Sequence, residues 1–178
     1  MRKLIASLYV SLDGVMEAPE TWHFDYLDDQ MQGVIQEGLS TTEGFLLGRR
    51  TYGEWAGFWP NQPADDPFAQ VFNTRPKFVA SSTLTEATWQ NSTIVRPDGL
   101  AELKQQTGGD LSVVGSATLV RSLLRDGLLD ELRLLVHPVV LGQGGRLFEE
   151  GLPRRTLELV TSETFKTGVL NLAYRPAA

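Results

Sequence analysis

The clearest pattern of apolar and polar positions lies in residues 111–148. An apolar run at the start of this stretch ends at Gly115, and Ser116 then occupies the position of a helix N-cap. The next apolar residues share one helical face, and Gly127 follows where a left-handed C-cap belongs. Residues 132–141 are apolar on both faces, which is typical of a strand covered by helices on both sides. The pattern therefore predicts a strand, a helix and a second, parallel strand.

Other parts of the chain alternate in the same way between short apolar runs and helical patterns. The predicted strands are residues 3–10, 44–47, 76–80, 93–95, 156–165 and 169–174. The predicted helices are residues 25–37, a helix opened by a capping box at residues 51–54, and residues 99–106. The last two strands partly alternate polar and apolar residues. We therefore predict an α/β fold: a mostly parallel mixed sheet with helices on both faces and an antiparallel C-terminal edge.

Length and composition are typical of one domain. With 178 residues, 42% of them hydrophobic, the chain can form a hydrophobic core that needs no disulfide bonds or bound metal to stabilise it, so we expect a single domain spanning residues 1–178. The absence of cysteine excludes disulfides, thiolate metal sites and cysteine nucleophiles. The net charge of −6 gives no overall attraction to nucleic acid or to an anionic membrane. The apolar run near the N-terminus is too short for a signal sequence or a membrane span, so we expect a cytoplasmic protein.

Three predicted strands end in groups suited to phosphate. They are Gly48-Arg49-Arg50-Thr51, Ser81-Ser82-Thr83 and Gly115-Ser116-Ala117-Thr118. None matches the glycine-rich dinucleotide fingerprint or the P-loop, and each alone is ordinary chemistry for a loop between a strand and a helix. Parallel strands, however, bring their carboxyl ends to one edge of the sheet, where α/β folds bind ligands. Together the three turns predict an anion-binding edge.

The order of these turns resembles that of a known family. Residues 11–14, 47–52, 81–83 and 114–148 together resemble the dihydrofolate reductase superfamily. They are most similar to the reductase domain of the riboflavin-biosynthesis deaminase-reductases and its stand-alone relatives. The resemblance covers nearly the whole chain; it is most specific in residues 127–148 and least specific in residues 15–32. It implies a dihydrofolate reductase-like fold, a homodimer, and a reductase that takes a hydride from NADPH.

The resemblance also implies where the cofactor binds. The helix start that holds cofactor phosphates consists of Gly48, Arg49, Arg50 and Thr51, and guanidinium groups suit phosphate oxygens. The implied contacts of the 2′-phosphate are Ser81 and Ser82. The helix N-terminus that faces the pyrophosphate consists of Gly115, Ser116, Ala117, Thr118 and Leu119. Relatives usually have consecutive glycines where this chain has Gly115-Ser116, so the side chain of Ser116 either crowds the cofactor or adds a hydroxyl donor.

Reduction needs a proton donor as well as a hydride. Asp13 follows the first strand in the Leu-Asp-Gly turn shared with the relatives, and it is our first candidate for binding the substrate or relaying a proton. An Asp-Gly pair also forms turns without any catalytic role, so both interpretations stay open. Asp25 and Asp28 are rival catalytic carboxylates, because dihydrofolate reductases carry one on the first helix beyond a tryptophan, here Trp22. Helix capping explains these two nearly as well.

Aromatic side chains and histidines in the same region are further candidates. A flat heterocycle can stack on Trp22, Phe24 or Tyr26, although aromatic residues more often belong to the core. His137 lies in a predicted buried strand and is expected to be a core residue, whereas His23 lies on a loop and is a candidate pocket residue. So few metal-binding side chains predict no metal site.

These implications converge on an NADPH-dependent reductase of a small nitrogen heterocycle. The most similar named activity is the reduction of 5-amino-6-(5-phosphoribosylamino)uracil, in which the ribosyl group becomes ribityl. Two alternatives stay open: a pterin, dihydrofolate-type or other NADPH reductase, and a nucleotide-binding module without turnover. We expect a small heterocyclic substrate and a second copy of the chain as partners, and neither nucleic acid nor a membrane.

Overall fold

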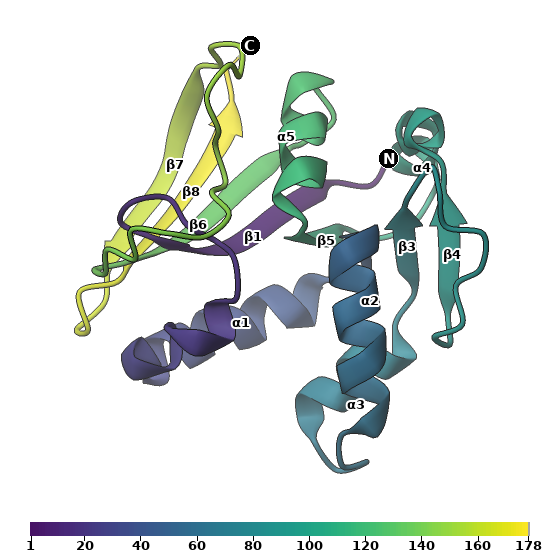
Figure 1. The fold of residues 1–178 in the computed structure, drawn as a ribbon, viewed down its shortest axis with the longest axis horizontal. Helices are drawn as coiled ribbons and strands as arrows, with labels where there is room; N and C mark the ends of the chain where they lie inside the picture. The colour runs from purple at the N-terminus through teal and green to yellow at the C-terminus, as the bar shows by residue number, and fades with distance from the viewer. Residues whose placement is uncertain (178) are drawn as a thin grey trace.

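The computed structural model describes residues 1–177, in which eight strands form one sheet with helices on both of its faces (Figure 1). The strand order across the sheet is β4-β3-β2-β5-β1-β6-β8-β7. The strands are β1 (Leu4–Ser11), β2 (Gly44–Gly48), β3 (Lys77–Ala80), β4 (Ser92–Val95), β5 (Leu111–Gly115), β6 (Glu131–His137), β7 (Leu157–Thr164) and β8 (Leu170–Pro176).

The sheet is parallel except at its C-terminal edge. From β4 to β6 every neighbouring pair of strands is parallel, whereas β8 pairs antiparallel with β6, and β7 pairs antiparallel with β8. This arrangement confirms the predicted mixed sheet. Strand β1 lies between β5 and β6 and pairs with both, so the predicted strand-helix-strand unit encloses the first strand of the chain. The carboxyl ends of β3, β2, β5, β1 and β6 therefore lie along one edge.

Within the described residues, five α-helices cover the sheet. They are α1 (Asp29–Thr41), α2 (Arg49–Phe58), α3 (Pro67–Thr74), α4 (Leu100–Gln105) and α5 (Ala117–Arg125). Short 3₁₀ helices occur at Pro19–Thr21 (η1), Phe24–Tyr26 (η2), Trp59–Asn61 (η3) and Pro97–Gly99 (η4). None of the helices in residues 1–177 is long and apolar enough to cross a membrane.

The pleat of the strands sends alternate side chains to opposite faces of the sheet. On one face, apolar residues of β1, β2, β5 and β6 form a core with α4 and α5 that includes Leu8, Leu46 and Leu123. On the other face, α2 and α3 pack on β2 and β3 around Phe45, while α1 packs on β6 through Met31. Figure 1 shows α5 on the opposite side of the sheet from α1, α2 and α3, which confirms the prediction of helices on both faces.

The first helix differs from its predicted span of residues 25–37. Residues 24–26 form the short η2 instead, and α1 begins after Asp28, whose carboxylate accepts a hydrogen bond from the backbone N–H of Met31 at 2.9 Å. This cap sets the start of the helix. The helix also continues through Gly38, because one glycine inside a helix costs only about 1 kcal/mol.

Two further boundaries were wrong. The capping box predicted at residues 51–54 does not open α2, because Gly48 is its N-cap and Thr51 already lies in the first turn. Strand β6 ends at His137 and does not reach residue 141 as predicted. Pro138 follows immediately, and proline has no N–H with which to continue the ladder of hydrogen bonds.

Candidate functional site

Two of the three turns predicted to bind phosphate lie in direct contact. Strand β2 ends at Gly48, the neighbouring strand β5 ends at Gly115, and the Gly115-Ser116 peptide bond is cis. A Cβ atom at Gly48 would lie 2.7 Å from the Oγ of Ser116 and 2.9 Å from its backbone nitrogen. A Cβ atom at Gly115 would lie 2.9 Å from the Oγ1 of Thr51. Glycine at both positions therefore lets the starts of α2 and α5 approach each other.

The third turn lies on the next strand along the same edge. Ala80, which ends β3, pairs with Gly48 at the end of β2. Ser81 follows, and its buried Oγ accepts hydrogen bonds from two backbone N–H groups of the turn. Ser82 is exposed. The predicted meeting of the three turns at one edge is confirmed, while their role in binding phosphate stays a prediction.

The two helices that begin at this edge lack side-chain caps. In the described chain, neither Gly48 before α2 nor Ser116 before α5 offers a side-chain hydrogen bond to the helix, so Ser116 occupies the predicted N-cap position without capping. Asp28 and Asp66, by contrast, do cap α1 and α3. The first N–H groups of an α-helix have no partner inside the helix and attract anions. Two such helix ends side by side form a place where an anion can bind.

Two arginines lie in the first turn of α2. Arg49 and Arg50 are both exposed, and the Nη1 of Arg50 lies 3.9 Å from the Oε1 of Glu17. Because both groups of this pair are more than half exposed, the pair is weak. The other carboxylate oxygen of Glu17 accepts a hydrogen bond from the N–H of Gly145 at 2.7 Å. Glu17 thus joins the start of α2 to the glycine-rich turn after β6, a link that no sequence pattern indicated.

The carboxylate of Asp13, which follows β1, is fully engaged. Its oxygens accept hydrogen bonds from the hydroxyl of Ser11 at 2.7 Å and from the N–H groups of Leu141 and Gly142 at 3.1 and 2.9 Å. The Nη2 of Arg146 lies 3.7 Å from its Oδ2. These hydrogen bonds, led by that of Ser11, lower the pKa of Asp13 to about 2. The contacts favour the turn-forming interpretation over proton donation, because the carboxylate stays ionised at neutral pH.

The rival carboxylates lie apart from these contacts. Asp28 is the N-cap of α1, which is the structural role that the sequence left open. Asp25 lies in η2 with an exposed side chain. In residues 1–177, neither carboxylate takes part in an ion pair. Of the three candidates, the structure brings only Asp13 against the glycine-rich turn.

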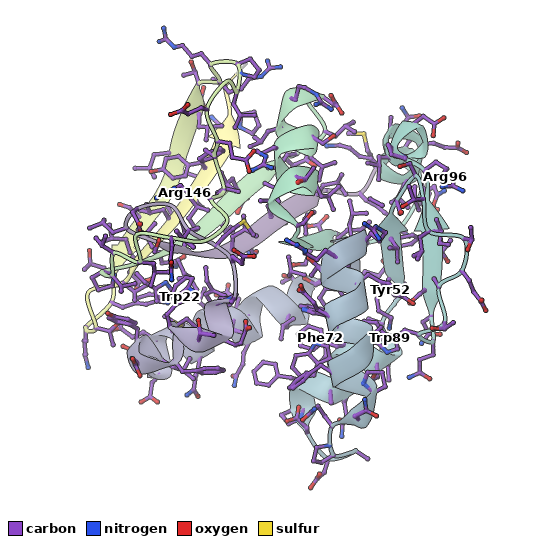
Figure 2. All side chains as sticks on the ribbon, viewed as in Figure 1. Trp22, Tyr52, Phe72, Trp89, Arg96 and Arg146 are labelled. Carbon is purple, nitrogen blue, oxygen red and sulfur yellow. The ribbon has the colours of Figure 1, made fainter. Side chains whose placement is uncertain are left out.

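An aromatic cluster surrounds His137 near the carboxyl ends of β1 and β6. Four rings meet its imidazole edge-on, with centroid distances between 5.1 and 6.2 Å: Tyr9, Trp22, His23 and Tyr26. His137 is fully buried, as predicted for a core residue, and its Nδ1 lies 2.9 Å from the carbonyl oxygen of Leu135. Figure 2 shows Trp22 on the same side of the molecule as Arg146, away from Tyr52, Phe72 and Trp89 around α2.

Phe24 is the member of this region that faces solvent. Its side chain is 59% exposed and its ring lies 4.1 Å from that of His23, which stacks in turn on Tyr9 at 4.5 Å. Burial, with a smaller contribution from His137, lowers the pKa of His23. Trp22 is only 8% exposed, so Phe24 is the more accessible of these predicted stacking residues. In the described residues no group of three or more His, Cys, Asp or Glu side chains can hold a metal ion.

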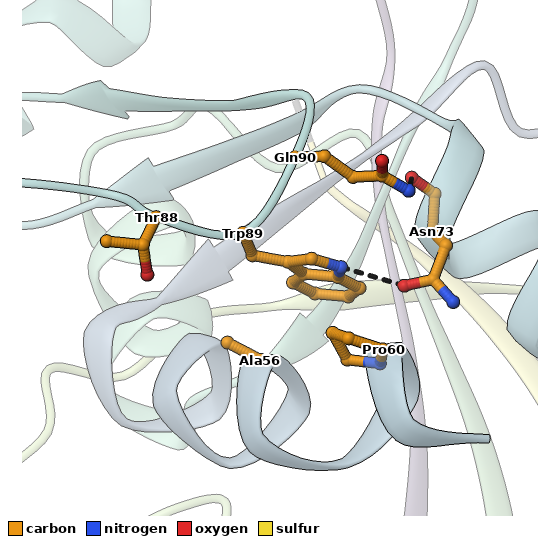
Figure 3. Close-up of a pocket in the computed structure, with 6 residues that line it drawn as sticks. All are labelled: Ala56, Pro60, Asn73, Thr88, Trp89 and Gln90. Atoms are coloured by element: carbon orange, nitrogen blue, oxygen red, sulfur yellow. Dashed lines mark hydrogen bonds between the residues drawn. The ribbon is translucent and has the colours of Figure 1, made fainter.

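Cavities occur at both ends of the sheet. One of about 520 Å³ borders the glycine-rich turn and is lined by Gly144, Gly145, Arg146, Phe148, Glu149 and Glu150. Another, of about 440 Å³, lies around Trp89, which comes just before β4 at the amino ends of β3 and β4 (Figure 3). There the indole N–H of Trp89 donates to the Oδ1 of Asn73 at 2.8 Å. Only the first cavity lies beside the turns at the carboxyl edge.

Known proteins resemble this chain in sequence and in fold. The Bacillus subtilis protein YyaP is 31% identical over 180 residues, which cover 97% of this chain and 94% of YyaP. The Thermotoga maritima diaminohydroxyphosphoribosylaminopyrimidine deaminase/5-amino-6-(5-phosphoribosylamino)uracil reductase is similar in structure, with a TM-score of 0.67 and 12% identity over 99% of this chain and 57% of that one. Enterococcus faecalis dihydrofolate reductase complexed with NADP(H) has a TM-score of 0.63 and 16% identity over 99% and 97%.

The two structural likenesses confirm the predicted dihydrofolate reductase-like fold. The sequence profile of the RibD C-terminal domain family matches residues 2–171, which is nearly the whole chain. The match includes all three turns of the carboxyl edge and the glycine-rich turn after β6. The chain therefore belongs to the RibD C-terminal domain family.

Proposed function

We propose that this protein is an NADPH-dependent reductase of a small nitrogen heterocycle. Membership of the RibD C-terminal domain family implies an oxidoreductase, and the cofactor and the substrate are the parts that we propose. The observation that carries the proposal is the pair of uncapped helix starts, α2 and α5, which meet beside Arg49 and Arg50. The phosphates of a dinucleotide provide the negative charge that these N–H groups and guanidinium groups attract.

We assign the cofactor to the carboxyl edge of β3, β2 and β5, where bound NADPH supplies the hydride. The proposed contacts are Gly48, Arg49, Arg50 and Thr51 with Gly115, Ser116, Ala117, Thr118 and Leu119 for the pyrophosphate, and Ser81 with Ser82 for the 2′-phosphate. The Oγ of Ser116 lies against Gly48, at the start of α2. This position supports the role of a hydroxyl donor over that of a group that crowds the cofactor.

We place the substrate at the ends of β1 and β6, next to the cofactor edge. The exposed ring of Phe24 supports this assignment, because it offers a flat heterocycle an apolar surface backed by His23 and Tyr9. Burial raises the pKa of Tyr9 to about 12, so its phenol keeps its proton. Asp13 is proposed as a positioning residue that fixes the turn after β1 against the glycine-rich turn. The proposed substrate class includes 5-amino-6-(5-phosphoribosylamino)uracil.

Oxidation of NADPH by the full chain tests the proposal. The loss of the nicotinamide absorbance should be followed with 5-amino-6-(5-phosphoribosylamino)uracil, a dihydropterin and dihydrofolate as candidate substrates. We expect oxidation with the first of these. Oxidation with a pterin alone would assign the protein to the alternative reductase class, and NADPH binding without oxidation of any candidate would favour a nucleotide-binding module. Absence of NADPH binding would refute the assignment of the carboxyl edge.

A matched pair of variants tests the cofactor contacts separately from turnover. Arg49→Gln removes an exposed guanidinium from the proposed site, whereas Arg154→Gln removes one from the loop between β6 and β7 with the same change in net charge. The first variant should raise the KM for NADPH, and the second should leave it unchanged. Equal effects of the two variants would mean that only the overall charge matters.

A further inference from the structure

Charge is distributed unevenly between the proposed substrate surface and the cofactor edge. Residues 4–48, which form β1, the loop after it, α1 and β2, contain eight of the 22 acidic residues of the chain and none of its 16 lysines and arginines. The cofactor edge begins directly afterwards with Arg49 and Arg50. The two neighbouring regions therefore attract ligands of opposite charge.

Two exposed carboxylates of this segment precede and follow the ring of Phe24. Asp25 is the next residue in η2, and Glu20 lies in η1 just upstream. Burial lowers the pKa of His23, whereas the negative charge of Glu20 raises it, so this carboxylate lies close to the imidazole that packs against Phe24. Within residues 1–177, neither Glu20 nor Asp25 has an ion-pair partner, so no neighbouring cation offsets their charge.

The arginine and the histidines at this end of the sheet supply little positive charge. Arg146 is held by Asp13, because its Nε donates a hydrogen bond to the carbonyl oxygen of Asp13 at 3.0 Å and its Nη2 lies 3.7 Å from the carboxylate. Burial lowers the pKa of His23 and of His137, so both imidazoles are uncharged at neutral pH. An anionic group bound at Phe24 would therefore meet carboxylates and neutral rings.

The packing behind Phe24 also leaves a hydrogen bond unmade. His23 is only 8% exposed, and its buried Nδ1 has no hydrogen-bond partner in the part of the chain that the structure describes. A buried polar atom without a partner raises the free energy of the folded chain, and a ligand can supply that partner. A neutral imidazole nitrogen suits the N–H and carbonyl groups at the edge of a nitrogen heterocycle. This unpartnered atom thus favours an uncharged ligand.

We propose that the substrate is a neutral or cationic nitrogen heterocycle without a phosphate group, and that Glu20 and Asp25 are the specificity-determining residues that select against a phosphate ester. A phosphomonoester carries a charge of about −1.5 to −2 at neutral pH. Carboxylates within the Debye length of about 8 Å repel such a group, whereas a neutral ring stacked on Phe24 meets no repulsion. The inference rests on the proposed function and narrows it: 5-amino-6-ribosylaminouracil should bind better than its 5′-phosphate, which is 5-amino-6-(5-phosphoribosylamino)uracil.

Binding of this matched pair of ligands tests the inference without turnover. Calorimetry on the full chain, with no cofactor present, measures the dissociation constants of 5-amino-6-ribosylaminouracil and of its 5′-phosphate. The wild-type chain should bind the phosphate-free compound at least about 10-fold more tightly. Glu20→Gln/Asp25→Asn should tighten binding of the phosphate ester about 3- to 10-fold and leave that of the phosphate-free compound unchanged. Added salt should likewise tighten binding of the ester to the wild-type chain, because screening weakens the repulsion.

Two control variants separate local from overall charge. Asp98→Asn/Glu102→Gln makes the same change in net charge at η4 and the adjoining α4, and α4 packs on the opposite face of the sheet from α1. This variant should keep the wild-type ratio of the two dissociation constants. Lys166→Gln removes an exposed lysine whose backbone N–H contacts the first turn of α1, and it should leave both constants unchanged.

The inference is overturned if the wild-type chain binds the phosphate ester as tightly as the phosphate-free compound, or if neither compound binds. It is also overturned if neutralising Glu20 and Asp25 leaves the ratio unchanged, or if Lys166→Gln loses affinity for the ester. Thermal unfolding of the unliganded chains separates ligand selection from folding, because the two double variants should have similar Tm values. The titrations need neither NADPH nor turnover, so a preference for the ester would refute this inference and leave the reductase proposal standing.

Discussion

Replacing Gly48 with alanine tests the contact on which the candidate site depends. Gly48 has φ −71° and ψ 156°, values that alanine adopts without strain. The new Cβ atom would lie 2.7 Å from the Oγ of Ser116 and 2.9 Å from its backbone nitrogen. Both distances are well below the optimal separation of about 3.5–4.0 Å for non-bonded atoms. A backbone nitrogen cannot rotate away as a side chain can, so the starts of α2 and α5 have to separate.

The expected loss of stability follows from two opposing effects. Overpacking of a close contact costs about 1–3 kcal/mol, whereas replacing glycine by alanine at a compatible φ stabilises the fold by about 0.4–1 kcal/mol through the unfolded chain. The free energy of unfolding of Gly48→Ala should therefore fall by about 1–2 kcal/mol. For a chain of this length each kcal/mol shifts the Tm by about 2–4 °C, so the Tm should fall by about 2–8 °C.

Urea unfolding and thermal unfolding measure this loss against two related variants. Gly53→Ala makes the same change inside α2, where a Cβ atom meets nothing within 4 Å, so it should stabilise the fold by about 0.5–1 kcal/mol. In a Ser116→Gly background, Gly48→Ala should lower the free energy of unfolding by a smaller amount. The contact with the Oγ is then gone, and only the contact with the backbone nitrogen of residue 116 is left. A Gly48→Ala chain as stable as the wild type would refute the close approach of the two helix starts.

Three further outcomes follow from buried and charged groups. The buried Nζ of Lys77 donates hydrogen bonds to three carbonyl oxygens at the end of α3, at 2.7 to 3.2 Å. Lys77→Met should therefore lower the free energy of unfolding, measured in urea, by about 1–3 kcal/mol. An unchanged free energy of unfolding would mean that the carbonyl oxygens find other donors. Burial lowers the pKa of His23 and of His137 below the ordinary value of 6.5. The unfolded chain therefore binds protons at a higher pH than the folded chain does, and stability should fall as the pH drops below 6.5. In thermal melts at a series of pH values, His23→Gln should make the Tm depend less steeply on pH. The pKa of Asp13 is lowered from 3.8 to about 2, so its contribution to stability is complete above pH 3.8 and is lost as the pH falls towards 2. Asp13→Asn should therefore lower the Tm at pH 7, and the difference in Tm between this variant and the wild type should become smaller as the pH falls towards 2.

The fold could be predicted wherever short-range patterns decide it. Apolar runs that stop at Gly48 and Gly115 marked the strands of the parallel sheet, and the partly alternating residues 156–174 marked its antiparallel edge. The position of β1 between β5 and β6 could not be predicted, because the residues that pair are separated by more than 100 positions in the chain. The start of α1 was missed since Asp25 and Asp28 are equally good caps in sequence, and only the structure shows which one accepts the N–H of Met31.

The candidate site, too, could be predicted from the sequence only where short-range patterns decide it. Its three turns were predictable because glycine, serine and arginine at strand ends suit phosphate whatever the rest of the chain does. The engagement of Asp13 was not, because two of its hydrogen-bond partners, Leu141 and Gly142, lie 128 and 129 residues away. Sequence patterns thus located the edge of the sheet, and long-range contacts decide what each side chain does there.

The missing caps of α2 and α5 connect stability to the proposed ligand. A capping side chain stabilises a helix by about 1 kcal/mol, and this chain uses aspartates for that purpose at α1 and α3. At α5 the hydroxyl of Ser116 lies against Gly48 and leaves the helix N–H groups uncapped. An anion that binds only the folded state can take the place of both caps. At a concentration of 100 times its Kd, such an anion raises the free energy of unfolding by about 2.7 kcal/mol. NADPH at that concentration should therefore raise the Tm by about 5–11 °C, and the rise should be smaller in Arg49→Gln, whose helix start attracts the anion less.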